Sequence, residues 1–163
     1  MTEDISNRID SFSGAYRFLS NFYPCRPGLI WLHGSLVGKF DRWFSTTEHA
    51  FQASKSLHPE DWEAIWRCNT PGEAKRLGRT LALRSDWDSV KQEVMFHLLR
   101  QKFSRRSPLR AALLRTGDAE LIEGNNWGDV YWGVCDGVGE NHLGRLLMLV
   151  RWQITHPEMG LNI

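Results

Sequence analysis

The stretch Thr46–Ser56 reads TTEHAFQASKS, and it sets the expectations for the rest of the chain. It predicts a helix, and at about 100° per residue one arc of that helix holds Glu48, Phe51, Gln52 and Lys55. The opposite arc holds Ala50, Ala53 and Leu57. Small residues on that side allow close packing, while the carboxylate and the amine face elsewhere.

Glu48 has two interpretations on pattern alone. Ser45-Thr46-Thr47-Glu48 has capping-box spacing, so Glu48 could serve only to satisfy the N-terminus of the helix. A surface ion pair with Lys55 is a poor explanation, because an offset of seven residues is about 10 Å along the axis. In the second interpretation, these two long side chains converge on a ligand that lies along the helix.

Length and composition limit the classes of function. A chain of 163 residues fits one compact domain and leaves no room for a second independent core. With 20 Lys and Arg against 19 Asp and Glu, the net charge of +1 gives no broad attraction to duplex nucleic acid or to an acidic membrane. Three widely spaced cysteines argue against a disulfide framework and a thiolate metal site. We expect a cytoplasmic protein, because the start MTEDISNRID is polar and no apolar run reaches membrane-spanning length.

Turn residues divide the chain into stretches of different character. Aromatic and β-branched residues alternate with Gly and Pro over Ile9–Phe44, which predicts short antiparallel strands. The pattern is helical over Thr46–Arg115. The stretch Asp118–Glu140 predicts a strand, AELIE, followed by a long loop, and a final helix begins near Asn141. The sequence therefore predicts a helix-rich α+β fold with a small antiparallel sheet.

Two helix starts carry recognisable signals. Thr70 and Glu73 flank Pro71 as an N-cap and the acidic residue of a capping box. Ser85 followed by Asp88 repeats that signal before a long amphipathic helix. The apolar stripe of that helix is expected to comprise Trp87, Val90, Val94 and Leu98.

Aromatic residues in the loop NNWGDVYWGVCDGVGEN also have two interpretations. Trp127 and Trp132, beside Asp129 and Asp136, could stack on a planar heterocycle whose ribose is held by polar groups. Alternatively, the aromatic rings pin the loop to the core. The loop also ends in GVGEN before a helix, a weak signal for phosphate binding by backbone N–H groups. The six histidines show no metal-ligand spacing, so we expect no metal.

The chain resembles the NADAR family of YbiA-like N-glycosidases in a series of ordered motifs. These are FLSNFYP, TTEHAFQASK, the Gly78-Arg79 pair behind EAKRL, Trp87, LRQKF, DVYWG and GVGENHLGRLLM. The resemblance runs from about Phe12 to Trp152. It implies a helix-rich α+β fold in one domain over residues 1–163, with a core of about 12–154 and short polar tails.

The resemblance also implies an activity and a set of site residues. The activity is cleavage of an N-glycosidic bond between ribose and a nitrogen, in phosphoribosylamino pyrimidines of early riboflavin synthesis or in ADP-ribose on guanine of nucleic acid. No cofactor, metal or membrane partner is implied. The expected catalytic residues are Glu48, Lys55 and Asp129. The expected substrate-binding residues are Asn21, Phe22, Gln52, Arg79, Trp87, Trp132 and Asn141.

The chain departs from the family pattern in places. Many members have a proline before the Glu-bearing helix, where this chain reads RWFSTTEH, and a Tyr where Ala50 stands. The region Pro24–Phe44 shows little similarity, and this bears on the choice of substrate.

Two catalytic mechanisms fit these residues, and a third interpretation involves binding without catalysis. Lys55 can attack the anomeric carbon and form a Schiff base, with Glu48 as acid and base and Arg79 on phosphate. In the rival mechanism, Glu48 or Asp129 activates water directly and Lys55 only binds phosphate. A module that binds ADP-ribose without cleaving it is the non-enzymatic alternative.

Overall fold

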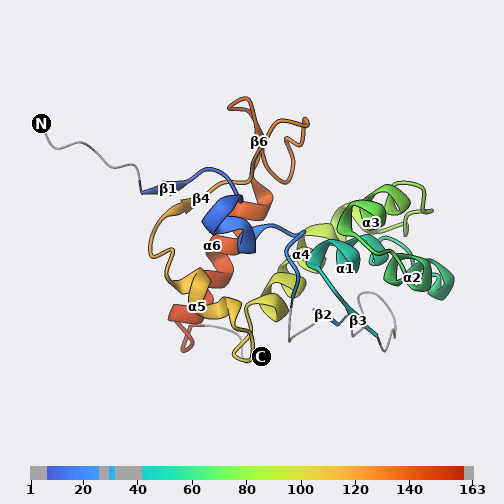
Figure 1. Ribbon diagram of the computed structural model, residues 1–163, viewed down its shortest axis with the longest axis horizontal. Coiled ribbons are helices and arrows are strands. Elements are labelled where there is room, and N and C mark those ends of the chain that lie inside the picture. Colours follow the sequence, from blue (N-terminus) through green and yellow to red (C-terminus); the bar gives the residue numbers. More distant parts are fainter. Residues whose placement is uncertain (1–6, 26–29, 32–41, 160–163) are drawn as a thin grey trace, which may run out of the picture. The chain divides into compact units, whose positions relative to one another are not determined.

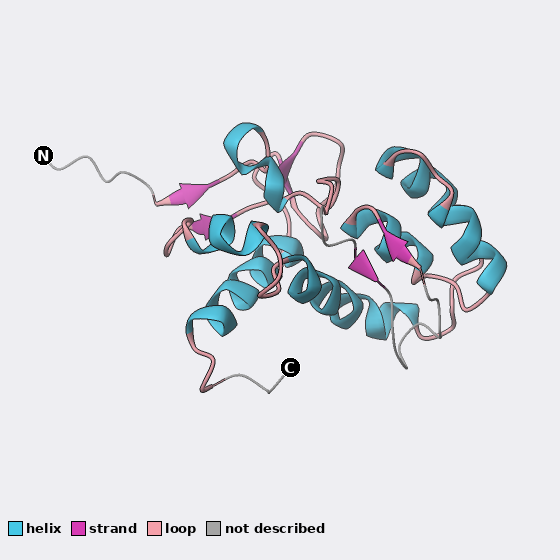
Figure 2. Cartoon of the chain, turned by 60° about the horizontal axis from the view of Figure 1, so that its bottom comes forward, coloured by secondary structure: helices cyan, strands magenta, loops and turns pink. Residues whose placement is uncertain are grey.

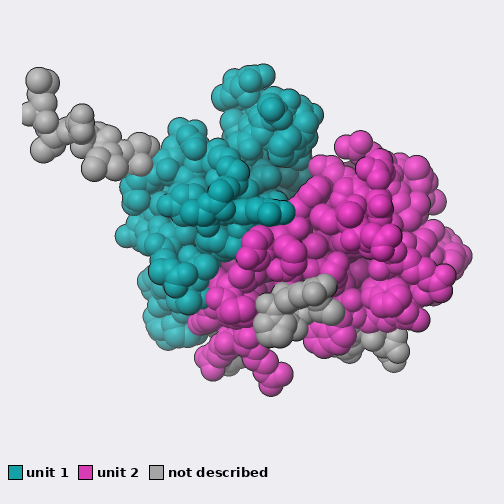
Figure 3. Space-filling view, viewed as in Figure 1, with its two compact units in different colours: residues 1–20, 111–163 teal, residues 21–110 magenta. Residues whose placement is uncertain are grey.

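The computed structural model describes residues 7–25, 30–31 and 42–159, which form helices joined by loops and very short strands (Figures 1 and 2). They divide into two compact units, one of residues 1–20 and 111–163 and the other of residues 21–110 (Figure 3). The helix-rich α+β class is confirmed by the helices and by a solved structure of the same fold. A single domain over the whole chain stays a prediction. None of the described helices is long and apolar enough to cross a membrane.

The unit of residues 21–110 is built around a short central helix. Its elements are β2 (Ile30–Trp31), β3 (Trp43–Phe44), α1 (Thr47–Ala53), α2 (Pro59–Trp66), α3 (Pro71–Gly78) and α4 (Trp87–Lys102). The helix α1 packs against α2, α3 and α4 (Figure 1), and all seven of its residues are buried. The predicted close packing at Ala50 and Ala53 is confirmed, because both are fully buried.

The helix α1 ends earlier than the sequence predicts. Ser54 is its C-cap, and Lys55 lies in the turn that follows. Leu57 is exposed, so its predicted place on the packed side of this helix is wrong. The reason is that the chain leaves the helical path after Ala53 and turns toward α2. No glycine or proline marks this end in the sequence, so the pattern gave no stop signal.

The capping-box interpretation of Glu48 is wrong. The N-cap is Thr46, whose hydroxyl accepts a hydrogen bond from the backbone N–H of His49 at 3.2 Å. His49 therefore occupies the third helical position, and Glu48 is only the second residue of the helix. A capping box requires the acidic residue at the third position, so the cap leaves the carboxylate of Glu48 available for another role.

The start of α3 follows the prediction. The Thr70 hydroxyl accepts from the backbone N–H of Glu73 at 3.1 Å, and the Glu73 carboxylate accepts from the backbone N–H of Thr70 at 3.3 Å. Pro71 begins the helix, where a missing N–H costs nothing. The capping box is thus confirmed.

The start of α4 differs from the prediction. The helix begins at Trp87 with Asp86 as the N-cap residue, so the expected Ser85–Asp88 signal is wrong. The Asp86 carboxylate is instead bound through both oxygens by the guanidinium of Arg84, at 2.5 and 2.8 Å. Behind this start, Trp87, Val94 and Leu98 are buried, so most of the predicted apolar stripe is confirmed.

The second unit holds the terminal segments. Its elements are β1 (Arg8–Ile9), the 3-10 helix η1 (Gly14–Leu19), β4 (Glu120–Leu121), β5 (Gly124–Asn125), β6 (Val134–Cys135) and α6 (His142–Thr155). The helix α5 (Leu109–Leu114) spans the boundary between the units. The strand in AELIE is confirmed as β4, and α6 begins after its N-cap Asn141, as expected.

The described strands pair as three separate two-stranded ladders. The pair β2–β3 is antiparallel, as the sequence led us to expect for this part of the chain. The pairs β1–β4 and β5–β6 are parallel. Local alternation cannot predict this arrangement, because β1 pairs with a segment from the far end of the sequence and each strand has only two residues.

His49 ties α1 to the chain after α2. Its Nε2 lies 3.1 Å from the carbonyl oxygen of Cys68, and its Nδ1 lies 2.7 Å from the hydroxyl of Thr46. A carbonyl can only accept, so Nε2 carries the proton and Nδ1 accepts from Thr46. Burial lowers the pKa of His49, although the Cys68 carbonyl and the charge of Glu73 act in the opposite direction. The folded protein therefore holds a neutral imidazole.

The buried imidazole predicts a loss of stability in mild acid. Unfolded His49 takes up a proton near its ordinary pKa of about 6.5, whereas the folded state resists protonation until a lower pH. Stability from His49 is thus complete above about pH 6.5 and falls as the pH drops toward the folded pKa. Urea unfolding at pH 8 and pH 5.5 should show a smaller pH difference in His49→Gln than in the wild type. An equal difference in both proteins would contradict this.

Candidate active site

Glu48 and Gln52 form a hydrogen-bonded pair on α1. Gln52 Nε2 donates to Glu48 Oε1 at 2.7 Å, and the two side chains lie one helical turn apart. The two residues expose only 6% and 4% of their surface. The backbone N–H of Glu48 donates to the carbonyl oxygen of Asn21 at 3.0 Å. Glu48 is therefore held both through its main chain and through its carboxylate.

Lys55 lies immediately beyond α1 and is held by its backbone. Its N–H donates to the Gln52 carbonyl at 3.3 Å, and its own carbonyl accepts from the N–H of Arg84 at 2.7 Å. Arg84 is in turn fixed by Asp86, so the turn that carries the lysine is tied to the start of α4. The position of Lys55 follows from these backbone contacts rather than from helical geometry.

The environment of Lys55 makes its amine easier to deprotonate. Burial is the main cause that lowers the pKa of Lys55; the negative charge of Glu48 raises it, and the positive charges of Arg79 and Lys75 lower it further. The groups that affect the pKa of Lys55 thus include Glu48 and Arg79, which the sequence selected, and Lys75, which it did not. Their convergence on one substrate stays a prediction.

Lys75 was missed by sequence reasoning, although a signal for it existed. It lies four residues before Arg79 on the same helix, so the two side chains share one face. Its ammonium also lies 5.8 Å from the centroid of the Phe22 ring, within range of a cation–π interaction. Phe22 is exposed and is thus placed beside this cationic face.

Asn21 precedes α1 and carries an unsatisfied polar atom. Its Nδ2 makes only a long contact of 3.6 Å with the sulfur of Met95. Its Oδ1 is buried and has no hydrogen-bond partner within the described part of the chain. A buried acceptor of this kind is costly unless a ligand supplies the donor. Asn21 therefore suits the substrate-binding role that was predicted for it.

Trp87 is buried against α1 and does not lie on an exposed surface. It is buried as the first residue of α4, and its ring lies 5.1 Å from that of Phe51 at an angle of 52°. This contact supports the helix that carries Glu48. A direct contact between Trp87 and the substrate stays a prediction.

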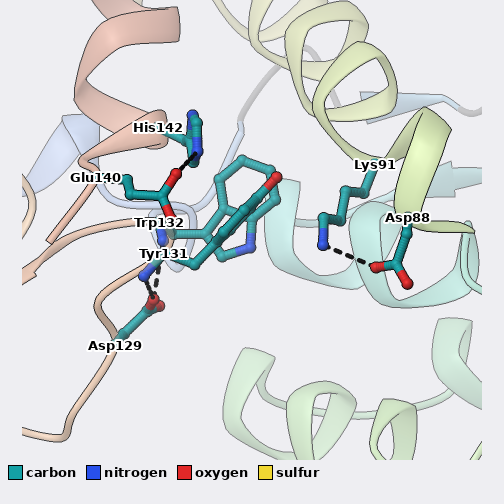
Figure 4. Close-up of polar contacts among 7 residues, drawn as sticks. All are labelled: Asp88, Lys91, Asp129, Tyr131, Trp132, Glu140 and His142. Carbon is teal, nitrogen blue, oxygen red and sulfur yellow. Dashed lines mark hydrogen bonds and ion pairs between the residues drawn. The ribbon is translucent and has the colours of Figure 1, made fainter.

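Asp129 belongs to the other unit, where it organises its loop. One carboxylate oxygen accepts from the backbone N–H groups of Tyr131 at 3.2 Å and Trp132 at 2.9 Å (Figure 4). Asn125 holds the same turn by accepting from the N–H of Asp129 at 3.0 Å and donating to its carbonyl at 2.7 Å. The contacts of Asp129 thus fix the backbone at Trp132, and its predicted role in proton transfer stays a prediction.

The aromatic residues of this loop differ in their surroundings. Trp127 is exposed, so pinning to the core does not explain it. Trp132 is half-buried and meets Tyr131 edge-on, with ring centroids 5.1 Å apart (Figure 4). Tyr131 also lies 4.4 Å from the ring of His142, whose Nε2 is 2.7 Å from the carboxylate of Glu140. Stacking of these rings on a heterocycle stays a prediction.

The end of the loop does not match the phosphate-binding expectation. The backbone N–H groups of Asn141, His142 and Leu143 donate to the carbonyl oxygens of Gly133, Tyr131 and Trp132, respectively. These groups were the proposed phosphate ligands, and the loop itself occupies them. That expectation is wrong for this helix start.

The side chain of Asn141 connects the loop to the strand β4. Its Oδ1 accepts from the N–H of Glu123 at 3.1 Å, and its Nδ2 donates to the carbonyl of Leu121 at 2.9 Å. Both ends of the carboxamide are thus used within the fold, which gives Asn141 a structural role. Its predicted contact with substrate stays a prediction. Across the described ranges, no three His, Cys, Asp or Glu residues are grouped to hold a metal ion.

The charges around Lys55 predict opposite effects of two substitutions. Glu48→Gln removes the negative charge and should lower the pKa of Lys55, whereas Arg79→Met removes a positive charge and should raise it. The rate at which a small acylating reagent modifies Lys55 can be followed against pH by peptide mass spectrometry. Lys91, which pairs with Asp88 at 2.8 Å (Figure 4), serves as an internal control. Shifts of the same sign in both variants would contradict this account.

Two substitutions of Asp129 separate its backbone contacts from its charge. Asp129→Asn keeps an acceptor oxygen for the N–H groups of Tyr131 and Trp132, whereas Asp129→Ala leaves both unsatisfied. Only the Ala variant should lose stability, by about 1 kcal/mol for each lost hydrogen bond, and be cleaved faster in the loop by a protease. Denaturant unfolding and limited proteolysis measure these effects. The exposed Asp136→Asn is the control for loss of charge; equal damage in both Asp129 variants would refute the assignment.

Comparison with known proteins places the chain in a family. The NADAR domain matches residues 10–155. The N-glycosidase YbiA of Escherichia coli (strain K12) is 46% identical over 113 residues, which cover 68% of this chain and 70% of that protein. The riboflavin biosynthesis protein VVA0006 of Vibrio vulnificus is 38% identical over 140 residues, 84% of this chain and 35% of that protein. The NMR structure of E. coli YbiA matches with a TM-score of 0.75 and 35% identity, over 98% of this chain and 92% of that chain. The chain belongs to the NADAR domain family.

Proposed function

We propose that this protein hydrolyses the N-glycosidic bond between a ribose and a nitrogen of a heterocycle, with Lys55 as the nucleophile and Glu48 as the acid and base. The curated relatives named N-glycosidases support the class of enzyme. One observation carries the mechanism: a half-buried lysine whose pKa is lowered lies within the electrostatic influence of a buried carboxylate. This is the combination that amine nucleophilic catalysis requires.

The first step is a proton transfer within the charged cluster. In the resting site, Glu48 is a carboxylate that accepts from Gln52, and Lys55 is an ammonium with a lowered pKa. A proton that passes from Lys55 to Glu48 gives a neutral amine and a carboxylic acid. The amine nitrogen then attacks the anomeric carbon, and the bond from that carbon to the heterocycle nitrogen breaks. Glu48 donates its proton to the departing nitrogen.

Water completes the reaction. The attached lysine nitrogen gives a proton to the ring oxygen as the bond from that oxygen to the anomeric carbon breaks. This opens the ribose ring and leaves a protonated Schiff base between Lys55 and the anomeric carbon. Glu48, again a carboxylate, takes a proton from a water molecule that adds to this carbon. Cleavage of the carbon–nitrogen bond to Lys55 then releases the free sugar and restores the amine. No oxidant or cofactor is consumed.

The surrounding cations suit a phosphorylated sugar. Arg79 and Lys75 present a guanidinium and an ammonium on one face of α3, close enough to affect the pKa of Lys55. Guanidinium groups bind phosphate oxygens through paired N–H donors, and a lysine adds a point charge. Both substrate classes implied by the family carry phosphate beyond the ribose. The cations therefore support either class and do not choose between them.

The substrate is a phosphoribosylamino pyrimidine of early riboflavin synthesis or ADP-ribose on guanine in nucleic acid. The first class is supported by the relative named as a riboflavin biosynthesis protein. For the second, the exposed ring of Phe22, which lies beside Lys75, offers a surface on which a base can stack. A cytoplasmic site of action fits the three free cysteines, Cys25, Cys68 and Cys135.

The proposal is tested by incubating the protein with each substrate in the presence of a borohydride reductant. We expect release of the free sugar from one class and a protein mass increase at Lys55, because reduction of a Schiff base makes it permanent. Glu48→Gln should lower kcat by about 100-fold or more, since it removes the acid and base. Lys55→Met should form no adduct.

The other outcomes are equally informative. Turnover by wild-type protein without any adduct at Lys55 would replace the Schiff base with direct hydrolysis. Binding without turnover of either substrate would overturn the enzyme and leave a nucleotide-binding module. Release of ADP-ribose alone would assign a role on modified nucleic acid, and release of ribose phosphate alone a role in metabolism.

A further inference from the structure

Glycine is an unusual choice at position 78, where α3 ends and packs closely against α1. It is the last residue of α3, and its φ lies outside the left-handed region that favours glycine. Glycine weakens a helix relative to alanine, so its backbone conformation gives no reason for it here. A Cβ added at this position would overlap Gln52 Oε1 and would lie 2.7 Å from Cδ and 2.9 Å from Cβ of Gln52. The glycine is required because the side chain of Gln52 occupies that space.

The same contact fixes which end of the Gln52 carboxamide meets Glu48. Nε2 donates to the carboxylate, and Oε1 lies against Gly78 without a hydrogen-bond partner in the described residues. Turning the amide over would point an oxygen at an oxygen of Glu48 and leave two N–H donors against a glycine. Buried donors without acceptors and facing oxygen atoms are both unfavourable. Gln52 therefore meets Glu48 only as a donor.

We infer that Gln52 is a positioning residue for Glu48, held in its donor orientation by Gly78, and not a ligand of the substrate. The inference rests on the proposed function and deepens it. An amide donor favours the ionised carboxylate, which is the form that must accept the proton of Lys55 in the first step. Gly78 directly precedes Arg79. The end of α3 therefore positions both Gln52, which holds the Glu48 carboxylate, and a cation of the site.

The first test removes the donor while keeping the shape of the side chain. Gln52→Met retains the length of Gln52 and cannot donate to Glu48. Since the ionised carboxylate loses its donor, the limb of the pH–rate profile that Glu48 controls should move to higher pH. We expect kcat to fall about tenfold to hundredfold and KM to stay within about twofold of the wild-type value. A rise in KM with unchanged kcat and pH profile would make Gln52 a substrate ligand and overturn the inference.

The second test uses a matched pair of glycines on α3. Gly78→Ala should displace Gln52 and lower kcat about 100-fold, as misplacement of a catalytic group by about 1 Å does. Gly72→Ala is the control, because its added Cβ would lie 3.9 Å or more from the nearest atoms, Thr70 Oγ1 and Arg76 Nη1. The control should keep its activity and unfold at the same or a higher urea concentration. Equal activity in the two variants would overturn the role of Gly78.

A double variant separates folding from positioning. In Gln52→Ala the contacts with Oε1 and Cδ are gone and only the Cβ of residue 52 remains, 2.9 Å from the added Cβ, so adding Gly78→Ala should reduce stability by less than it does in the wild type, while kcat stays low because the donor is absent. Additive losses of stability would show that the two residues do not act through this contact. If wild-type protein cleaves neither substrate, the proposed function fails. The stability cycle and the pH dependence of Lys55 labelling in Gln52→Met then still confirm or refute the contact itself.

Discussion

The complete burial of the seven-residue helix α1 is the constraint on which the site depends. A helix of this length is not stable by itself in water, so its conformation comes from packing against α2, α3 and α4. Close packing needs small residues, and Ala50, Ala53 and Gly78 supply them. Burial also makes an unpaired carboxylate on α1 costly. The pairing of Gln52 with Glu48 is thus a requirement of the fold as well as a feature of the chemistry.

Burial and the negative charge of Glu48 shift the pKa of Lys55 in opposite directions. Removal from water favours the neutral amine, and the positive charges of Arg79 and Lys75 act in the same direction, whereas Glu48 favours the ammonium. A site without the carboxylate would hold a free amine but no acid for the leaving nitrogen. A site without burial would hold a full ammonium that cannot attack. In the proposed mechanism, this balance provides both forms through one proton transfer from Lys55 to Glu48.

The cap at Thr70 followed directly from local residue types, whereas the position of Lys55 did not follow from helical periodicity, because α1 ends before it. The other failures depended on contacts that residue patterns do not show. The chain leaves α1 where the N–H of Arg84 donates to the distant Lys55 carbonyl, and α4 begins where the guanidinium of Arg84 binds the nearby carboxylate of Asp86. The parallel pairing of the terminal strands is likewise invisible to local alternation. Lys75 belongs to no motif of its own, and only its spacing of four residues from Arg79 indicates it.

The loop of residues 124–141 limits the kind of recognition it can offer. Three side chains form hydrogen bonds that hold the loop backbone: those of Asn125, Asp129 and Asn141. The N–H groups at the start of α6 donate to carbonyl oxygens of the loop. If these groups bound a polar ligand, the hydrogen bonds that hold the loop backbone would first have to break. The exposed indole of Trp127 and the half-buried ring of Trp132 are different, because stacking on a ring face costs the loop no hydrogen bond. Stacking tolerates different heterocycles. Stacking on these two rings could therefore accept different planar groups without any change in the hydrogen bonds that shape the loop.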